Sequence, residues 1–408
     1  MTRASGNAAR MAAALASRLA DPPAITTEHD RRLAQSLAKG AAGTALLHIE
    51  RARTGFAGWH AAHAWLTTAA STGISAAEDA GLFAGVPAVA FAVRAAGDGR
   101  YARALAQLDT RVAALAHHRA SQAQARIDSG HLAPLAEFDL IYGLTGIGAY
   151  LLHSDPGGSA LEHVLQYLAR LTEPLRIDSQ ILPGWWTSHD PSFRYSASFA
   201  GGHANFSMAH GIAGPLTLMS LATRNGLTVD GQQQAIARIC GWLDTWRQEH
   251  DTGSWWPQWV TRTDLSTRRP AQPGPLRPSW CYGTPGLARA QQLAAIATAD
   301  GTRQEAAEHA LAGCLSDPRQ LAQITDTSVC HGWAGVFQTA WRAARDACTS
   351  ALPSHLPHLA DQLTAQRRRD AGYGTGFLEG DAGLALTLHT AARLTPPATG
   401  WDACLLLA

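Results

Sequence analysis

The chain has 408 residues, of which 46% are hydrophobic and 16% charged, so it holds enough apolar material for a large buried core. Its formal net charge of +1 gives no electrostatic argument for binding nucleic acid or an anionic membrane. No run of about 18 apolar residues is present, which predicts a protein without a transmembrane segment.

The N-terminal stretch lacks the apolar core of a secretory signal, because Arg10, Arg18 and Asp21 interrupt it. The cysteines are scattered and do not form the dense framework of a small secreted domain. They stand at positions 240, 281, 314, 330, 348 and 404. Together these features predict a soluble cytoplasmic protein with reduced thiols.

A G-x-x-G element followed by a stretch rich in Ala and Leu recurs along the chain. It occupies residues 40–43, 81–85 in a degenerate form, 143–146, 211–214, 283–286, 332–335 and 380–383. Successive copies are mostly about 45 to 70 residues apart, which is enough for two helices and their loops. Each copy is expected where the chain turns into an inner helix, since glycine permits close backbone approach.

The segments between the G-x-x-G elements are amphipathic. One of them places Ile236, Cys240, Leu243 and Trp246 on a single helical face. The stretches that follow G-x-x-G are instead apolar on nearly all sides. This contrast predicts inner helices covered by outer ones, in a single all-α domain over residues 1–408 that closes into a ring of helical hairpins.

Two segments, residues 176–207 and 250–279, break the helical pattern. Both contain Pro, Gly, Ser and paired Trp, which is typical of long loops or short strands. Long loops in a compact domain are often functional, so we expect both as insertions at the mouth of the ring.

Three junctions between outer and inner helices carry residues with chemical potential: Cys281 before Gly283, the Cys330–His331 pair before Gly332, and His210 before Gly211. If the repeats are equivalent, these side chains lie at one height around one axis. Thiolate and imidazole are preferred zinc ligands, and a set of two Cys and one His leaves the fourth position open. The pattern predicts a catalytic zinc. The other cysteines lie within helical stretches and are interpreted as core residues.

A zinc held by two thiolates is a mild Lewis acid, and a thiol entering its open position loses its proton. This chemistry favours activation of a thiol for attack on an electrophile over hydrolysis. Asp139 and His210 are candidate proton-exchanging groups, and Arg277 is a candidate for stabilising a developing oxyanion.

Five stretches resemble the lanthionine synthetase C-like (LanC) family, and in particular its stand-alone lanthipeptide cyclases. They are FDLIYGLTGIGAYLL, NFSMAHGIAGPLTLMSLA, RPSWCYGTPGLARA, CHGWAGVFQTA and GFLEGDAGLALTL, in the family's order. CHG-x-AG together with W-CYG-x-PG is highly specific, and the resemblance extends from about residue 40 to the end. One departure is Ser207, where the family usually has Gly; it adds bulk without removing a catalytic group.

The resemblance implies an α/α toroid, a double ring of about seven helical hairpins. The two loop insertions, which match no motif of the family, are expected near its active-site mouth. It also implies one zinc ion per chain, bound by Cys281, Cys330 and His331. The implied activity forms a carbon–sulfur bond: a peptide cysteine thiol adds in a Michael-type reaction to dehydroalanine or dehydrobutyrine, giving the lanthionine or methyllanthionine of a lanthipeptide antibiotic.

By the same resemblance, four further residues fall on active-site positions: Asp139, His210, Arg277 and Tyr282. The implied substrate is a dehydrated precursor peptide. Because the sequence contains no dehydratase domain, a separate dehydratase is the expected partner.

Other functions compete with this one. A LanC-like zinc protein could instead bind or conjugate a thiol such as glutathione. A protein prenyltransferase also activates a peptide thiol on zinc, but its usual ligands include Asp. A glycosidase on an (α/α)₆ barrel needs two carboxylates, and Asp139 has no partner carboxylate at an equivalent junction.

Overall fold

The computed structural model describes residues 3–71, 73–177, 180–365 and 374–408. By their internal contacts, the chain divides into two compact units. The first unit comprises residues 1–112, 324–345 and 352–408, and the second comprises residues 113–323 and 346–351. The interpretation of residues 1–408 as one domain stays a prediction.

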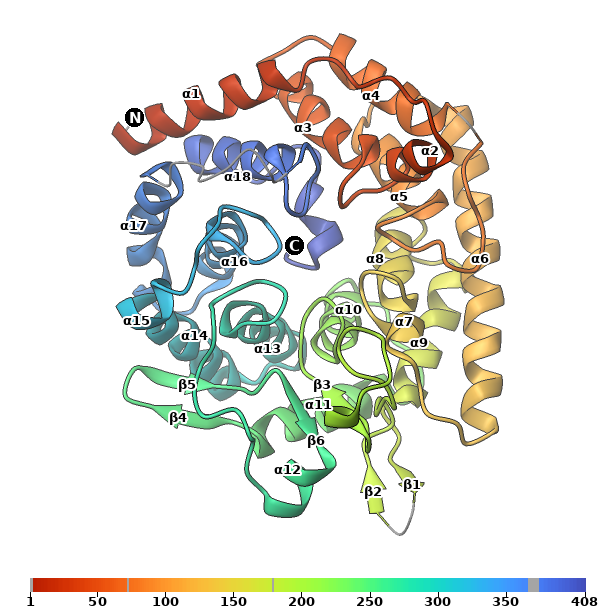
Figure 1. Cartoon of the computed structure of the whole chain (residues 1–408), viewed down its shortest axis with the longest axis vertical. Coiled ribbons are helices and arrows are strands. Elements are labelled where there is room, and N and C mark those ends of the chain that lie inside the picture. Colours follow the sequence, from red (N-terminus) through yellow and green to blue (C-terminus); the bar gives the residue numbers. More distant parts are fainter. Residues whose placement is uncertain (1–2, 72, 178–179, 366–373) are drawn as a thin grey trace. The chain divides into compact units, whose positions relative to one another are not determined.

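The first unit combines helices from both ends of the chain (Figure 1). These helices are α1 (Arg3–Arg18), α2 (Glu28–Ala34), α3 (Ala41–Arg53), α4 (His60–Ala70), α5 (Val86–Ala95), α16 (Trp333–Asp346), α17 (Ala351–Ala365), α18 (Asp381–Arg393) and the 3₁₀ helix η2 (Trp401–Leu405). α1 packs along α18, and α18 packs against α3. The N-terminal and C-terminal parts of the chain therefore share one core.

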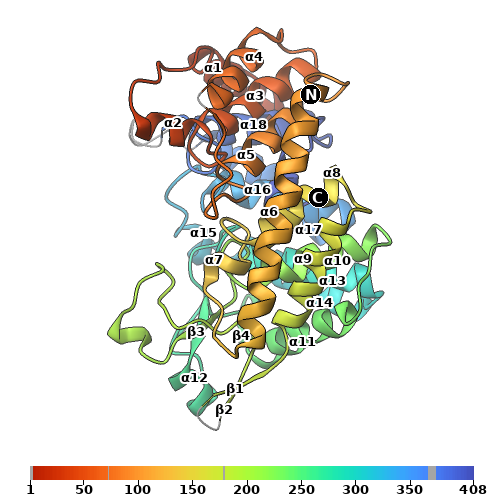
Figure 2. The ribbon, with the colours of Figure 1, turned by 90° about the vertical axis from the view of Figure 1, so that its right-hand side faces the viewer.

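The long helix α6 (Ala102–Asp128) begins in the first unit and continues into the second (Figure 2). The other helices of the second unit are α7 (Leu135–Phe138), α8 (Leu144–Ser154), α9 (Ser159–Leu171), η1 (Ala197–Phe199), α10 (Ala213–Arg224), α11 (Gln232–Thr245), α12 (Arg262–Thr267), α13 (Thr284–Thr298), α14 (Gly301–Ser316) and α15 (Pro318–Leu321). Its strands are β1 (Leu175–Ile177), β2 (Gln180–Leu182), β3 (His203–Asn205), β4 (Gln248–His250), β5 (Gly253–Trp255) and β6 (Trp259–Thr261).

Each helix that follows a G-x-x-G element is buried along most of its length. In the described chain these inner helices are α3, α5, α8, α10, α13, α16 and α18. The glycines allow the close packing: a Cβ on Gly286 would lie 2.0 Å from the carbonyl oxygen of Trp280. No described helix is both long and apolar enough to span a bilayer.

Outer helices cover the inner ones, as the amphipathic segments predict. α9, α11 and α14 pack against α8, α10 and α13 in the second unit, and α4 packs against α3 in the first. On α11, Ile236, Cys240 and Leu243 are buried as expected, and burial raises the pKa of the Cys240 thiol to about 11. Cys348 contradicts the sequence interpretation, because it lies after the end of α16 and is exposed rather than in the core.

The two irregular segments are joined to each other by strand pairing in the second unit. β3, from residues 176–207, pairs antiparallel with β6, from residues 250–279, with His203 opposite Thr261. β1 pairs with β2, and β4 pairs with β5. After β6 the chain forms α12, whose first turn is closed by a capping box between Thr261 and Asp264.

Within each unit, backbone hydrogen bonds connect neighbouring junctions. In the second unit, Leu140 N donates to Ala209 O at 3.1 Å and Met208 N donates to Cys281 O at 2.9 Å. In the first unit, Cys330 N donates to Leu378 O at 2.9 Å. Junctions far apart in sequence are thus held side by side, through residues that lie two or three positions before the first glycine of each G-x-x-G element.

Burial of His389 on α18 makes the stability of the first unit pH-dependent. Burial, with Arg393 and Arg51 nearby, lowers the pKa of His389 from 6.5 to about 4. Between pH 6.5 and 4 this imidazole is protonated in the unfolded chain but neutral in the folded chain. The free energy of unfolding therefore falls as pH drops from 6.5 towards 4. This loss is about 2–3 kcal/mol.

We expect His389→Gln to flatten the pH dependence of the unfolding free energy over this window, measured by urea titration at a series of pH values. His29→Gln, at an exposed helical position, is the control and should leave the profile unchanged. An identical slope in His389→Gln and the wild type would contradict the assignment.

Candidate active site

Five of the junctions share one local turn. The residue four positions before the first glycine is Ser or Asp, and its side chain accepts a hydrogen bond from the amide just before that glycine. The acceptor–donor pairs are Ser36–Lys39, Asp139–Tyr142, Ser207–His210, Ser279–Tyr282 and Ser328–His331. The turn therefore fixes the backbone of the residue that precedes each glycine.

Asp139 uses both carboxylate oxygens. Oδ1 closes the local turn by accepting from Tyr142 N at 2.6 Å and Gly143 N at 2.7 Å. Oδ2 lies 2.6 Å from Nδ1 of His210. A Ser at this position would close the turn but offer no second oxygen, so the Asp is the sequence signal for this pair.

In this pair, a buried carboxylate accepts a hydrogen bond from a partly exposed imidazole. The Asp139 side chain is 0% exposed and that of His210 is 21% exposed. Because the carboxylate accepts from Nδ1, the neutral ring leaves Nε2 without its proton and able to exchange one. The structure thus brings together two predicted residues that lie 71 positions apart.

Tyr282 lies near His210, with ring centroids 6.3 Å apart. Its hydroxyl accepts from Asn205 Nδ2 at 2.9 Å. Burial raises the pKa of Tyr282 to about 12, against the opposing effect of hydrogen bonds from Asn205 and Ser207. The phenol therefore keeps its proton at neutral pH and is a hydrogen-bond donor.

Sequence reasoning missed Asn205 and took Ser207 only as added bulk. Asn205 Oδ1 accepts from Ser207 N at 2.9 Å, and Ser207 Oγ accepts from His210 N at 2.9 Å. Together they hold the loop that carries the imidazole and tie it to Tyr282. The signal for Asn205 is its position two residues before the Ser of the turn, which Asp326 shares in the Cys330 junction.

Arg277 begins the junction that carries Cys281 and Tyr282, and it is half-buried. Cys281 is 7% exposed, with Sγ 3.7 Å from Ser279 Oγ. It stands two residues before Gly283, the register that Cys330 occupies before Gly332.

Cys330 and His331 belong to the first unit, and Cys281 belongs to the second. The ligand atoms of Cys330 and His331 lie within 4.8 Å of each other. Asp326, which the sequence reasoning also missed, is buried, with Oδ2 3.5 Å from Nε2 of His331. A thiol and an imidazole on one turn, with a carboxylate behind the imidazole, is a donor set that suits zinc.

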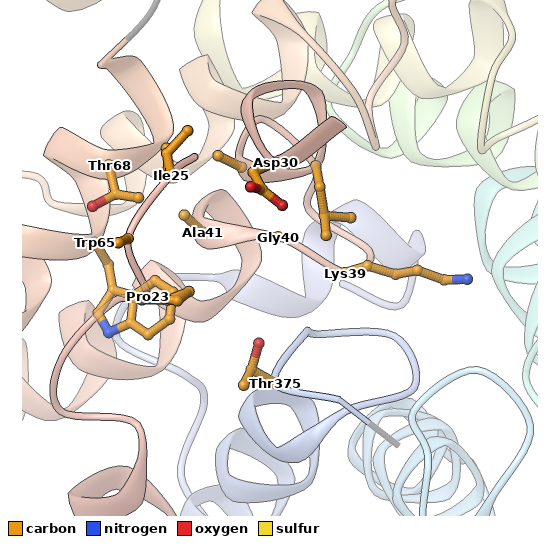
Figure 3. Close-up of a pocket in the computed structure, with 12 residues that line it drawn as sticks. Pro23, Ile25, Asp30, Lys39, Gly40, Ala41, Trp65, Thr68 and Thr375 are labelled. Atoms are coloured by element: carbon orange, nitrogen blue, oxygen red, sulfur yellow. The ribbon is translucent and has the colours of Figure 1, made fainter. Parts of the chain in front are cut away.

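A separate cavity of about 130 Å³ in the first unit carries little chemistry (Figure 3). Trp65, Pro23 and Ile25 give it apolar walls, and the Lys39 side chain points away from it. Oδ2 of Asp30 already accepts from the backbone amides of Thr26 and Thr27. None of the predicted site residues lines this cavity.

Taken together, the fold and these junctions define a helical-repeat protein with a buried carboxylate–imidazole pair and thiol-bearing turns. The sequence profile described as "Lanthionine synthetase C-like protein" matches residues 32–406. The chain therefore belongs to the lanthionine synthetase C-like family.

Two known proteins show the relationship in more detail. The nisin biosynthesis protein NisC of Lactococcus lactis subsp. lactis is 24% identical over 260 residues, spanning 62% of this chain and 60% of that protein. The solved structure of nisin cyclase superimposes with a TM-score of 0.77 at 20% identity, covering 98% of this chain and 97% of that one. This likeness confirms the predicted fold class, the α/α toroid.

Proposed function

We propose that the protein is a zinc-dependent lanthipeptide cyclase that forms thioether rings in a dehydrated precursor peptide. The observation that carries the proposal is the Asp139–His210 pair, because His210 lies on a loop whose Met208 N donates to Cys281 O at 2.9 Å. An acid–base pair is thus held beside a thiol-bearing junction within one unit, in a chain of this family.

In this proposal, Cys281, Cys330 and His331 bind one zinc ion. Three features support it: the donor types, the equal register of the two cysteines, and the closeness of the Cys330 and His331 donors. Asp326 would fix the orientation of the His331 ring. When bound, zinc supplies a centre at which the substrate thiol loses its proton.

The remaining residues act on the dehydro residue of the peptide, which is the electrophile. The cysteine sulfur forms a bond to Cβ of the dehydro residue, and the π electrons move towards the carbonyl, leaving an enolate. His210 takes up at Nε2 the proton that the thiol loses, and Asp139 stabilises the resulting imidazolium through Nδ1. The imidazolium then delivers this proton to Cα. The phenol of Tyr282 and the Arg277 guanidinium are donors for the enolate oxygen.

The substrate and its supply follow from this chemistry. A dehydro residue forms when Ser or Thr loses water, so a separate dehydratase is the proposed partner. We propose the cytoplasm as the compartment, since the six cysteines are scattered along the chain and do not have the dense spacing of a disulfide framework.

The proposal is tested with purified protein and a synthetic peptide that carries one dehydrobutyrine and one cysteine. We expect the peptide to lose its reactivity towards a thiol-alkylating reagent while its mass stays unchanged, because ring closure is an isomerisation. The same peptide with Thr in place of dehydrobutyrine is the control. A thiol that stays alkylatable, while added glutathione is consumed instead, would favour the glutathione alternative.

A further inference from the structure

Two aromatic rings that the mechanism does not use lie against His210. Tyr142 stacks on the imidazole with centroids 5.9 Å apart and planes at 19°. Phe193 meets the imidazole edge-on at 5.3 Å and meets Tyr142 at 5.5 Å. All three belong to the second unit. The acid–base group is therefore bordered by an aromatic pair, Tyr142 and Phe193.

The loop that carries Phe193 is closed by Asp190. Its carboxylate Oδ1 accepts from Ser192 N at 2.8 Å and Arg194 N at 3.0 Å. Its backbone also pairs with that of Arg194 and Phe193. Hydrogen bonds from these amides lower the pKa of Asp190, so the carboxylate stays charged and the turn stays closed at neutral pH.

The His189 ring supports the Phe193 ring by stacking against it. The two rings stack with centroids 5.5 Å apart. His189 Nε2 accepts from Leu135 N at 3.2 Å, and Nδ1 lies 2.9 Å from the carbonyl oxygen of Asp190. Both nitrogens are engaged in hydrogen bonds, so the His189 ring is held in place against Phe193.

Packing alone does not account for this placement. Phe193 has φ +63°, a left-handed conformation that a bulky side chain adopts only at a cost that glycine avoids. Yet 37% of Phe193 and 45% of Tyr142 remain exposed, so part of each residue stays open to a bound molecule beside His210. Strain of this kind, beside a proposed acid–base group, points to a ligand.

We infer that Tyr142 and Phe193 form the binding surface for the dehydro residue itself. This inference rests on the proposed function, and it names the specificity element of that site. In dehydroalanine or dehydrobutyrine the Cα=Cβ bond is conjugated with the carbonyl, so the residue is planar. A planar π system binds to aromatic rings by stacking or edge contact and gains more from them than a saturated residue of the same size. Binding there places Cα beside His210.

The test compares two acetylated hexapeptides of Ala and Gly that differ at one central position. One carries dehydrobutyrine and the other carries its saturated counterpart, 2-aminobutyrate. Neither contains cysteine, so no reaction occurs and the dissociation constants can be measured by NMR titration. We expect the wild type to bind the dehydro peptide roughly 2- to 10-fold more tightly.

Phe193→Gly is expected to lose this preference while its melting temperature stays near that of the wild type, because glycine accepts the left-handed backbone and this gain offsets the lost ring contacts. Phe193→Leu keeps apolar bulk without a π face and should lose most of the preference, whereas Phe193→Tyr should keep it. Tyr195→Ala is the matched control on the same loop, since Tyr195 is 84% exposed.

Two results would overturn the inference: a wild type that does not distinguish the two peptides, or a Phe193→Gly protein that distinguishes them as well as the wild type. Failure of the proposed function is seen separately. A wild type that prefers the dehydro peptide, yet closes no ring when cysteine is added to it, keeps the inference and refutes the cyclase.

Discussion

His210→Ala is expected to slow ring closure by about 10²–10⁴-fold, the usual contribution of a general acid. The reason is that the enolate must gain a proton at Cα, and His210 is the imidazole that Asp139 holds in place in the second unit. The rate is measured as loss of alkylatable thiol from a peptide with one dehydrobutyrine and one cysteine. Zinc content should stay at the wild-type level.

Asp139→Asn is the matched variant for this prediction. Asparagine retains an oxygen that can accept from Tyr142 N and Gly143 N, so the turn should survive. Its amide would face His210 Nδ1 with a donor instead of an acceptor and would favour the other tautomer. We expect a large loss of rate with an unchanged melting temperature. Near-normal ring closure by His210→Ala would refute the acid role and leave the zinc proposal standing.

Cys330→Ala is expected to reduce bound zinc from about one ion per chain to nearly none, and to abolish ring closure with it. Cys330 supplies one of two thiolates in the proposed ligand set, and an alanine leaves too few donors for tight binding. Cys281→Ala should have the same effect. Metal content is measured by elemental analysis of purified protein.

Cys348→Ala is the control for the zinc experiment, because this cysteine is exposed and lies apart from the junctions. Chelation of the wild type should leave its helical circular dichroism largely intact. The seven inner helices of the described chain are buried by apolar packing, so we expect them to stay folded without a metal. Full zinc retention in both Cys330→Ala and Cys281→Ala would eliminate the site, and unfolding on chelation would make the metal structural.

Much of the architecture could be predicted from the sequence, because it depends on local patterns. The G-x-x-G elements marked the start of each inner helix, and apolar periodicity separated inner helices from outer ones. The register of Cys281, Cys330 and His331 before their glycines was also readable, since equal positions in a repeat occupy equal places in its turn. The one failure of this kind, Cys348, lies just beyond a helix end, where periodicity no longer constrains burial.

The tertiary structure decided which of these residues act together. Asp139 contacts His210 across 71 positions, and Asn205 contacts Tyr282 across 77, through hydrogen bonds that no local pattern contains. The position of the Phe193 ring depends on a turn with a left-handed backbone inside an irregular segment. Helix propensity and periodicity act over a few residues, whereas these contacts depend on how separate loops are joined by backbone hydrogen bonds. The sequence therefore determined the scaffold and the chemical types, and only the folded chain determined the pairings that turn them into a site.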